Sequence, residues 1–355
     1  MPGGAAAYEE PMLDRAMIAL AAPRFLVALA LWCVGAAVHG QPAAPEPQDI
    51  PAWFSETFLD FREDLRDAAA RGKRLMVYFG QDGCPYCREL MQNNFSQKDI
   101  ADKTRRHFDA IALNIYGDRE VTWVDAKVRP EKEFAAQIKV QFTPTLLFLD
   151  ERGNVLLRLN GYYPPHRFRA ALDWVTDRSP ARAPFAEYLR KAAPEAANPG
   201  LNEQPFFAKP PYRLKRAANA KPLAVLFEHA NCANCDEMHA KGFADPAVKA
   251  LLRRFEVVRL PLFGRDAVLT PQGKASTAAE WARELGVAYS PSLVFFDAGG
   301  REVFRVEAYV RPFHLASSLD YVASGAYRTQ PSFQRFVRER ADALREKGGS
   351  VELWR

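Results

Sequence analysis

Two pairs of cysteines are the residues of this chain best suited to chemistry. Cys84 and Cys87 are separated by two residues, and Cys232 and Cys235 repeat that spacing 148 positions later. Each pair follows an apolar run and a polar turn, and each stands where a helical pattern begins. The unpaired amide groups and the dipole at the start of a helix stabilise a thiolate. The spacing therefore predicts thiol–disulfide exchange.

The first pair has the clearer division of roles. Cys84 precedes the expected helix and should be the more exposed sulfur, so we expect it to be the nucleophile. Cys87 lies one turn inside the helix and would resolve the mixed disulfide. Pro85 suits the first helical turn, where its missing N–H costs nothing. Tyr86 is either an aromatic residue that faces the substrate or an ordinary surface residue.

Other interpretations of the two pairs have less support. A structural disulfide that closes a four-residue loop gains little stability from chain entropy. A four-cysteine zinc site would have to bring together two pairs that are 148 residues apart. Each pair already has the apolar run, the polar turn and the helix start that a redox dithiol needs. Neither pair is followed directly by the histidine that covalent haem requires. We therefore expect redox chemistry with no cofactor and no resident metal.

The second pair leaves more alternatives open. Cys232 and Cys235 enclose Ala-Asn, and His229, Met238 and His239 lie close to them in the sequence. Sulfur and imidazole ligands suit copper or zinc. The second pair is therefore redox active, metal binding, or part of a docking domain without turnover. We expect His239 to be a solvated helix residue.

The composition is that of a globular protein with two domains. The chain has 355 residues, of which 48% are hydrophobic and 26% are charged, and its formal net charge is +5. The basic residues are scattered along the chain, so binding to nucleic acid is not expected.

The first 40 residues resemble an export signal. Arg15 and Arg24 precede an apolar run from Phe25 to Val38, which is short for a membrane span but suits a secretory signal peptide. Cleavage is expected after Gly40, with an uncleaved membrane anchor as the alternative. Removal of Cys33 would leave four cysteines, all of them in the two pairs. An exported protein of this kind, expected in the periplasm, reserves its cysteines for chemistry.

Apolar periodicity predicts a regular order of elements around the first pair. A helix over residues 51–71 is expected from its aromatic spacing, and a tight turn at residues 150–154 should join the two final strands. The expected order is helix 51–71, strand 75–79, helix from the cysteines to about 94, short helix 98–107, strand 108–115, helix 130–138, strands 146–149 and 155–159, and helix 166–175.

The second half repeats this plan. Ser290 and Pro291 precede an apolar strand, 147 positions after Thr143 and Pro144 precede theirs. A matching turn follows at residues 297–300, so the landmarks of the two halves share nearly one offset and indicate a duplication. Residues 179–222 are rich in Pro and Ala and are expected to be a linker with one short helix, and a tail over residues 326–355 should carry an amphipathic helix from 332 to 347.

With these features, each half resembles a thioredoxin-fold domain. The first half is particularly similar to periplasmic thioredoxin-like proteins of the SoxW type and their DsbC-like relatives, through FGQDGCPYC at residues 79–87 and TPTLLFLDERG at residues 143–153. The resemblance implies an α/β fold of two tandem thioredoxin-like domains, at residues 51–178 and 223–325. Each domain would have a central mixed sheet of four or five strands flanked by helices.

The resemblance also implies a substrate site. A cis bond before Pro144 would place Thr143 beside the first dithiol, where its backbone would pair with an extended substrate segment. Ser290 and Pro291 would be the counterparts in the second half.

One departure from many thioredoxins concerns proton transfer. The position six residues before the first cysteine, where those proteins carry a buried acid, holds Tyr78 in one half and Leu226 in the other. The proton of the resolving thiol must then leave through water or another group, such as Asp82 or Glu228.

Together these features predict an exported thiol–disulfide oxidoreductase that acts as a reductase of protein or small-molecule disulfides. Its partners would be a disulfide-containing protein substrate and a membrane electron donor. The second pair would act on its own substrates or exchange electrons with the first. The alternative is a copper- or zinc-binding or partner-docking protein without turnover.

Overall fold

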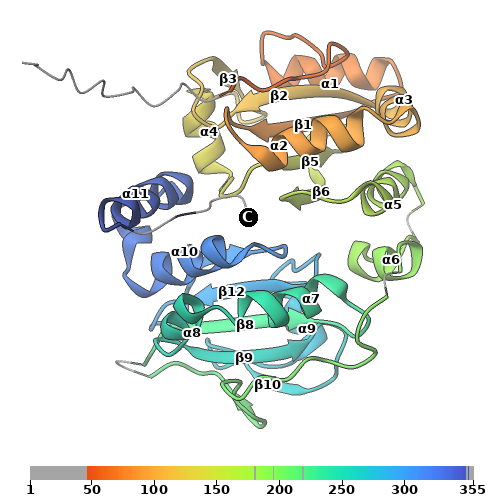
Figure 1. Ribbon diagram of the computed structural model, residues 1–355. Coiled ribbons are helices and arrows are strands. Elements are labelled where there is room, and N and C mark those ends of the chain that lie inside the picture. Colours follow the sequence, from red (N-terminus) through yellow and green to blue (C-terminus); the bar gives the residue numbers. More distant parts are fainter. Residues whose placement is uncertain (1–45, 180, 195, 218–219, 349–350, 352–355) are drawn as a thin grey trace, which may run out of the picture. The chain divides into compact units, whose positions relative to one another are not determined.

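The computed structural model describes residues 46–351 apart from 180, 195, 218–219 and 349–350 (Figure 1). The expected signal peptide, its cleavage after Gly40 and Cys33 lie outside the described residues. Within the described part of the chain, no helix combines the length and apolar character needed to cross a membrane.

The first half is built on a four-stranded sheet with the strand order β2-β1-β5-β6 (Figure 1). Strand β1 pairs in parallel with β2 and antiparallel with β5, so the sheet is mixed as expected. The bounds are α1 Phe61–Ala70, β1 Arg74–Gly80, α2 Pro85–Glu89, η1 Leu90–Phe95, α3 Lys98–His107, β2 Phe108–Asn114, β3 Glu120–Thr122, β4 Val128–Pro130, α4 Glu131–Gln137, β5 Thr145–Leu149, β6 Val155–Asn160 and α5 Pro165–Thr176.

The central strand of this sheet is buried on both faces. Met76 and Tyr78 point into one apolar core, whereas Leu75, Val77 and Phe79 point into the core on the opposite face. A strand covered on both faces needs a continuous apolar sequence, and β1 has one. The predicted strands and the last helix of this half are confirmed to within one or two residues.

The predicted helix over residues 51–71 is wrong in its first half. Helix α1 begins only at Phe61, because Leu59 has a positive φ of 59° and the side chain of Asp60 caps the helix. Phe58, which the aromatic spacing placed on the buried face, is 100% exposed. The left-handed conformation of Leu59 and the cap at Asp60 therefore set the start of α1, although the aromatic spacing in the sequence extends further upstream.

The second half repeats the architecture in a sheet with the order β13-β12-β8-β9. Phe79 pairs with Thr145 in the first sheet, and Phe227 pairs with Ser292 in the second, so the two central strand pairs share one register. The predicted duplication is confirmed. The bounds are α6 Phe185–Ala192, β7 Tyr212–Arg213, β8 Leu223–Glu228, α7 Ala233–Glu237, η2 Met238–Gly242, α8 Pro246–Leu252, β9 Glu256–Pro261, β10 Ala267–Leu269, β11 Ala275–Thr277, α9 Ala278–Glu284, β12 Ser292–Phe296, β13 Glu302–Val306, α10 Pro312–Ala323, η3 Ala326–Arg328 and α11 Phe333–Glu346.

The segment expected to be a linker contributes to the second half. Phe207 is buried in the core beneath β8, and Leu214 is buried in the core on the other face. Strand β7, which also lies in this segment, joins β10 and β11 in a small sheet. These residues are therefore structural parts of the second domain.

The amphipathic helix expected near the C-terminus is present as α11. Phe333, Val337 and Ala341 recur every four residues and are buried, with Phe333 and Val337 in the second core. The side chain of Ser332 accepts a hydrogen bond from the backbone amide of Arg335 and caps the helix.

A buried histidine in α10 should make the stability of the protein depend on pH. His314 is 8% exposed, and its burial, with a smaller contribution from Arg311, lowers its pKa to about 4. The unfolded chain takes up a proton below about pH 6.5, but the folded chain does so only near pH 4. The contribution of His314 to the free energy of unfolding should therefore fall as the pH drops from 6.5 to 4, by on the order of 3 kcal/mol.

Urea unfolding across this pH range checks the expectation. His314→Gln should reduce the loss of stability between pH 6.5 and 4, because the group that takes up the proton is gone. His166→Gln, at an exposed histidine, is the matched control and should leave the pH profile unchanged. Identical pH profiles for the wild type and His314→Gln would contradict the prediction.

Candidate functional site

Both cysteine pairs occupy the start of a helix that follows the central strand. Cys84 is the N-cap of α2, and Cys232 is the N-cap of α7. Each pair forms a disulfide with a Cα–Cα distance of 5.2 Å. In both halves the α-helical turn that carries the pair continues directly into a π-helical segment, a feature that is frequent at functional sites. The helical placement inferred from the sequence is confirmed.

The geometry of the first pair suits a thiolate at Cys84. The backbone amide of Cys87 lies 3.1 Å from Cys84 Sγ and donates to it. Cys84 is 5% exposed and Cys87 is 2% exposed, so Cys84 is the more accessible sulfur although both are mainly buried. An amide at a helix start that points at sulfur favours the negative form, as expected for a nucleophile.

The loop before β5 brings Thr143 to the same sulfur. The Thr143–Pro144 bond is cis, as the resemblance to a thioredoxin fold implied. Thr143 Oγ1 donates to Cys84 Sγ at 3.4 Å, and the carbonyl oxygen of Thr143 lies 3.6 Å from that sulfur. Residues far apart in the sequence thus meet at one atom. Pro85 occupies the first turn of α2 as predicted, and Tyr86 is half-buried, with its pKa raised by burial.

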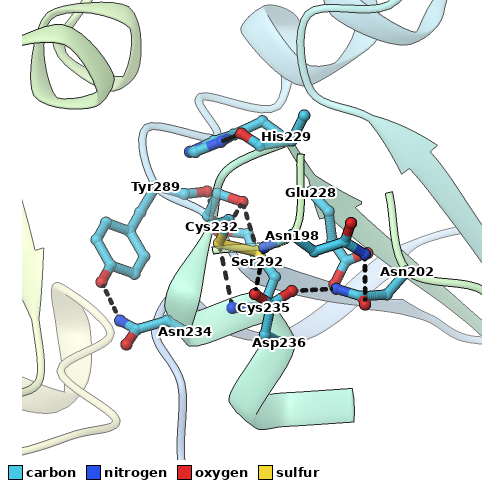
Figure 2. The surroundings of a disulfide bond; sticks show 12 residues. Asn198, Asn202, Glu228, His229, Cys232, Asn234, Cys235, Asp236, Tyr289 and Ser292 are labelled. Atoms are coloured by element: carbon cyan, nitrogen blue, oxygen red, sulfur yellow. Dashed lines mark hydrogen bonds between the residues drawn. A yellow bond between two sulfur atoms is a disulfide. The ribbon is translucent and has the colours of Figure 1, made fainter. Parts of the chain in front are cut away.

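The second pair has the equivalent arrangement with serine in place of threonine (Figure 2). The backbone amide of Cys235 donates to Cys232 Sγ at 3.1 Å. The Ser290–Pro291 bond is cis, and Ser290 Oγ lies 3.6 Å from Cys232 Sγ and 3.2 Å from Cys235 Sγ. The four residues assigned to the second site are therefore brought together by the fold.

A segment that precedes each domain is hydrogen-bonded to the loop before its dithiol. In the first half, Gly83 donates its backbone N–H to the carbonyl of Glu46 at 2.8 Å, and the backbone N–H of Gln48 donates to Asp82 Oδ1 at 3.2 Å. We call residues 46–49 the first leading segment. The sequence gives no periodic signal for such a contact, and the prediction missed it.

The second half has a similar contact from residues 198–204, the second leading segment. Asn231 donates its backbone N–H to the carbonyl of Asn198 at 2.7 Å. Both oxygens of Asp236 accept hydrogen bonds, one from the backbone N–H of Asn198 and one from the side-chain amide of Asn202 (Figure 2). Gly83 and Asn231, which make the matching contacts, both have positive φ, a conformation that Gly and Asn tolerate best.

A cavity of about 140 Å³ lies between the first leading segment and Cys87. Tyr78 lines it and donates its hydroxyl hydrogen to Gln48 Oε1 at 2.6 Å. Burial is the main cause that raises the pKa of Tyr78, so its phenol stays neutral in the physiological range. Asp82 is exposed in the loop before Cys84, where its side chain accepts a hydrogen bond from the backbone N–H of Gln48.

A buried histidine and a buried glutamate pair with each other in the second half. His239 is buried and lies 2.8 Å from Glu228, which has no exposed surface. The expectation that His239 is a solvated helix residue is wrong, because a strand residue distant in sequence supplies its partner. His229 instead approaches the carbonyl oxygen of Ala230 at 2.7 Å.

Metal binding by the described residues gains no support from their positions. No three side chains of the types His, Cys, Asp and Glu converge on a point within the described part of the chain. Met238, considered above as a soft ligand, is fully buried in the apolar core of the second half.

The family to which the chain belongs follows from a comparison with protein-family models. The model of the thioredoxin-like domain matches the chain twice, over residues 61–176 and 214–323. Because these matches cover more than half of the chain, the chain belongs to the thioredoxin-like domain family and contains two copies of that domain. No curated protein sequence matches the chain.

Solved structures similar to this chain include single thioredoxin-fold domains. A thioredoxin-fold protein from Helicobacter pylori is 28% identical, with 34% of this chain and 78% of that chain covered and a TM-score of 0.29. A thioredoxin from Thermus thermophilus is also 28% identical, with 34% and 88% covered and a TM-score of 0.28. A DsbH oxidoreductase is 18% identical, with 34% and 87% covered and a TM-score of 0.23.

Proposed function

We propose that the protein is a thiol–disulfide oxidoreductase that reduces disulfides in proteins or small molecules. The observation that carries the proposal is the setting of Cys84 Sγ, which receives a hydrogen bond from the amide of Cys87 and lies beside Thr143 and the cis-Pro144. This setting stabilises a thiolate and leaves a backbone segment next to it for a substrate. Cys232 and Cys235 form the second dithiol of the same proposal.

The reaction proceeds through a mixed disulfide. The Cys84 thiolate attacks one sulfur of the substrate disulfide, a new S–S bond forms, and the other substrate sulfur leaves as a thiolate. Cys87 then loses its proton and attacks Cys84 Sγ, which breaks the bond to the substrate and releases the second thiolate. The substrate gains two electrons, the protein loses two as the Cys84–Cys87 disulfide, and the leaving thiolates take up protons from Cys87 and solvent.

The substrate would be held by the loop before β5. An extended segment beside its disulfide would pair with the backbone of Thr143, and Tyr86 would contact it from α2. In the second half, Ser290 and Pro291 would bind an extended substrate segment in the same way next to Cys232. Backbone pairing of this kind accepts many sequences, because it does not depend on the substrate side chains.

The proposal includes export to the periplasm and a membrane electron donor that reduces the dithiol after each turnover. Export is supported by the apolar run from Phe25 to Val38 and the small residues after it. The donor is supported by the resemblance of residues 79–87 and 143–153 to periplasmic thioredoxin-like proteins. A disulfide-containing protein is the proposed partner on the substrate side.

An insulin-reduction assay on the purified protein, with a small dithiol as electron source, tests the function. The wild-type protein should accelerate reduction well above the small dithiol alone, and a variant with all four paired cysteines replaced by serine should not. Absence of acceleration by the wild type would contradict the proposal. Stoichiometric retention of copper or zinc by the reduced thiols, without turnover, would favour a metal-binding protein instead.

A further inference from the structure

Equivalent residues of the two halves meet at a shared surface, and the halves belong to one compact unit. Asn160 and Glu307 are 147 positions apart, which is the offset between the two cis-proline loops, and Asn160 Nδ2 donates to Glu307 Oε2 at 2.5 Å. Gly161 and Ala308 follow them, and a Cβ atom at Gly161 would lie 3.6 Å from the Cβ atom of Ala308. Contact between equivalent surfaces is typical of symmetric dimers, so the halves pair as two protomers would.

The aromatic residue before each cis-proline loop packs against the other half. The ring of Phe142 lies 5.3 Å from that of Phe333 and 5.9 Å from that of Phe304. At the equivalent position of the second half, the ring of Tyr289 lies 4.9 Å from that of Tyr163. The loop assigned to substrate binding in each half is therefore partly covered by the other half, which leaves a folded protein little room to reach it.

A cavity of about 250 Å³ remains between the halves at the first dithiol. Cys84 and Thr143 line it from the first half, and residues 306–311 line it from the second. We call it the interface pocket. The boundary between domains is a common place for small-ligand sites, and this volume is near the lower end of their range. The space beside Cys232 is about 20 Å³, so the first dithiol is the one with room for a small substrate.

Three tyrosines line the interface pocket, and all three are half-buried. Tyr86 comes from α2 beside Cys84, whereas Tyr162 and Tyr309 are equivalent residues of the two halves. Burial is the main cause that raises the pKa of each, to about 12 for Tyr309. The phenols therefore stay neutral near neutral pH and offer ring faces and hydroxyl groups without charge. Because these side chains keep some exposure, small solutes can enter from solvent.

Charged side chains of both signs complete the lining. The guanidinium carbon of Arg311 lies 5.9 Å from the centre of the Tyr86 ring. Glu89 and Glu237 line the pocket as well, and Glu237 also binds Lys241 at 2.7 Å. A guanidinium group binds a carboxylate through two parallel hydrogen bonds, and carboxylates accept hydrogen bonds from ammonium groups. The lining therefore suits a small molecule that carries both an ammonium and a carboxylate group.

The other titratable groups of the lining contribute less charge. Glu307 accepts hydrogen bonds from Arg305 and Asn160. His314 is buried, and its pKa of about 4 keeps it neutral near neutral pH. The charge pattern that a ligand meets is thus set by Arg311 and by the two glutamates named above.

We infer that the interface pocket binds small disulfides that carry ammonium and carboxylate groups, and that the first dithiol reduces them in preference to disulfides of folded proteins. The inference rests on the proposed function and narrows its substrate class. Arg311 would bind a carboxylate of the substrate, and Glu89 and Glu237 would bind an ammonium group. Amino-acid disulfides and disulfides of very short peptides have this chemistry.

The reaction is the exchange described above with a small substrate R–S–S–R. The Cys84 thiolate bonds to one sulfur, and the other sulfur leaves as a thiolate. Attack of Cys87 on Cys84 Sγ then releases the second thiolate. The two electrons come from the protein dithiol, its two protons end on the two R–S–H products, and the proposed electron donor restores the dithiol.

A comparison of small disulfides with a protein disulfide tests the inference. The protein carries Cys232→Ser and Cys235→Ser and is fully reduced, and its oxidation is followed by mass spectrometry after quenching with an alkylating reagent. The substrates are cystine, cystamine with ammonium groups only, dithiodipropionate with carboxylates only, neutral hydroxyethyl disulfide, and insulin. Each rate is divided by the rate of the same substrate with dithiothreitol, which corrects for intrinsic reactivity. The corrected rate should be about tenfold or more higher for cystine than for hydroxyethyl disulfide or insulin.

Charge variants separate substrate binding from a structural role. Arg311→Gln should lower the corrected rate with dithiodipropionate about tenfold more than the rate with cystamine, and Glu237→Gln should do the reverse. A merely structural role would lower all rates together. Arg283→Gln, at an exposed residue of α9, is the matched control and should change none of them.

Two results would overturn the inference while the proposed function stands. One is equal corrected rates for cystine, hydroxyethyl disulfide and insulin, and the other is the same effect of each charge variant on every substrate. Glu237→Gln keeps the test valid if Arg311→Gln does not fold. If no disulfide oxidises Cys84 and Cys87, the proposed function of the first dithiol fails, and the inference fails with it.

Discussion

Replacing Cys84 by serine removes the attack of the first dithiol on disulfides, and replacing Cys87 by alanine preserves the attack but traps its product. The reason is that the two cysteines have different roles. The amide of Cys87 stabilises negative charge on Cys84 Sγ, which attacks, and the Cys87 thiol resolves the product. Serine cannot supply a comparable nucleophile, so the rate of mixed-disulfide formation should fall by about 10³-fold or more. Without Cys87, the adduct with the substrate should accumulate because no internal thiol resolves it.

Both variants are best measured with Cys232→Ser and Cys235→Ser in place, so that the second dithiol contributes nothing. Mass spectrometry after a brief reaction with a disulfide peptide should detect the adduct in Cys87→Ala and no adduct in Cys84→Ser. Since the backbone amide of residue 87 is retained in Cys87→Ala, the first step should keep its rate. An adduct on residue 87 in a Cys84→Ser protein would reverse the assigned roles.

Truncation of Phe134 should cause a large loss of stability in the first half. Phe134 is fully buried, and its ring lies 4.8 Å from that of Trp123, 6.0 Å from that of Phe79 and 6.1 Å from that of Phe61. Phe134→Ala removes these contacts and leaves a cavity that the sheet cannot close. The free energy of unfolding of this half should fall by about 3–5 kcal/mol, as measured by urea unfolding.

Phe58→Ala provides the matched control, because the same side chain is removed from a fully exposed position. Its unfolding curve should overlay that of the wild type. A loss below about 1 kcal/mol for Phe134→Ala would show that the core of α4 and β1 repacks around the cavity, which would argue against the tight packing described here.

Much of the fold could be predicted because its signals are local. The apolar run of β1, the helix start at Cys84 and the repeated order of elements all follow from neighbouring residues. The start of α1 could not be predicted in this way, because the cap at Asp60 and the left-handed Leu59 compete with an aromatic periodicity that extends further upstream.

The cysteines of the candidate site were predicted from their spacing. Its cis-proline loops were predicted from the resemblance to a thioredoxin fold. The contacts around the dithiols were not predicted. Glu228 and His239 meet only through the fold, one from a strand end and one from a helix. The two leading segments reach the dithiols through backbone carbonyls at Glu46 and Asn198, and such contacts leave no pattern in the amino-acid types.

The second leading segment has a practical consequence for anyone who wishes to isolate the C-terminal half. A fragment that starts at Leu223, where the sheet begins, would lose the aromatic ring of Phe207 from its interior and the carbonyl of Asn198 from its reactive loop. Excision just upstream of Asn198 keeps both. The residues that complete the second half thus begin inside the proline-rich stretch, some 25 residues before its first central strand.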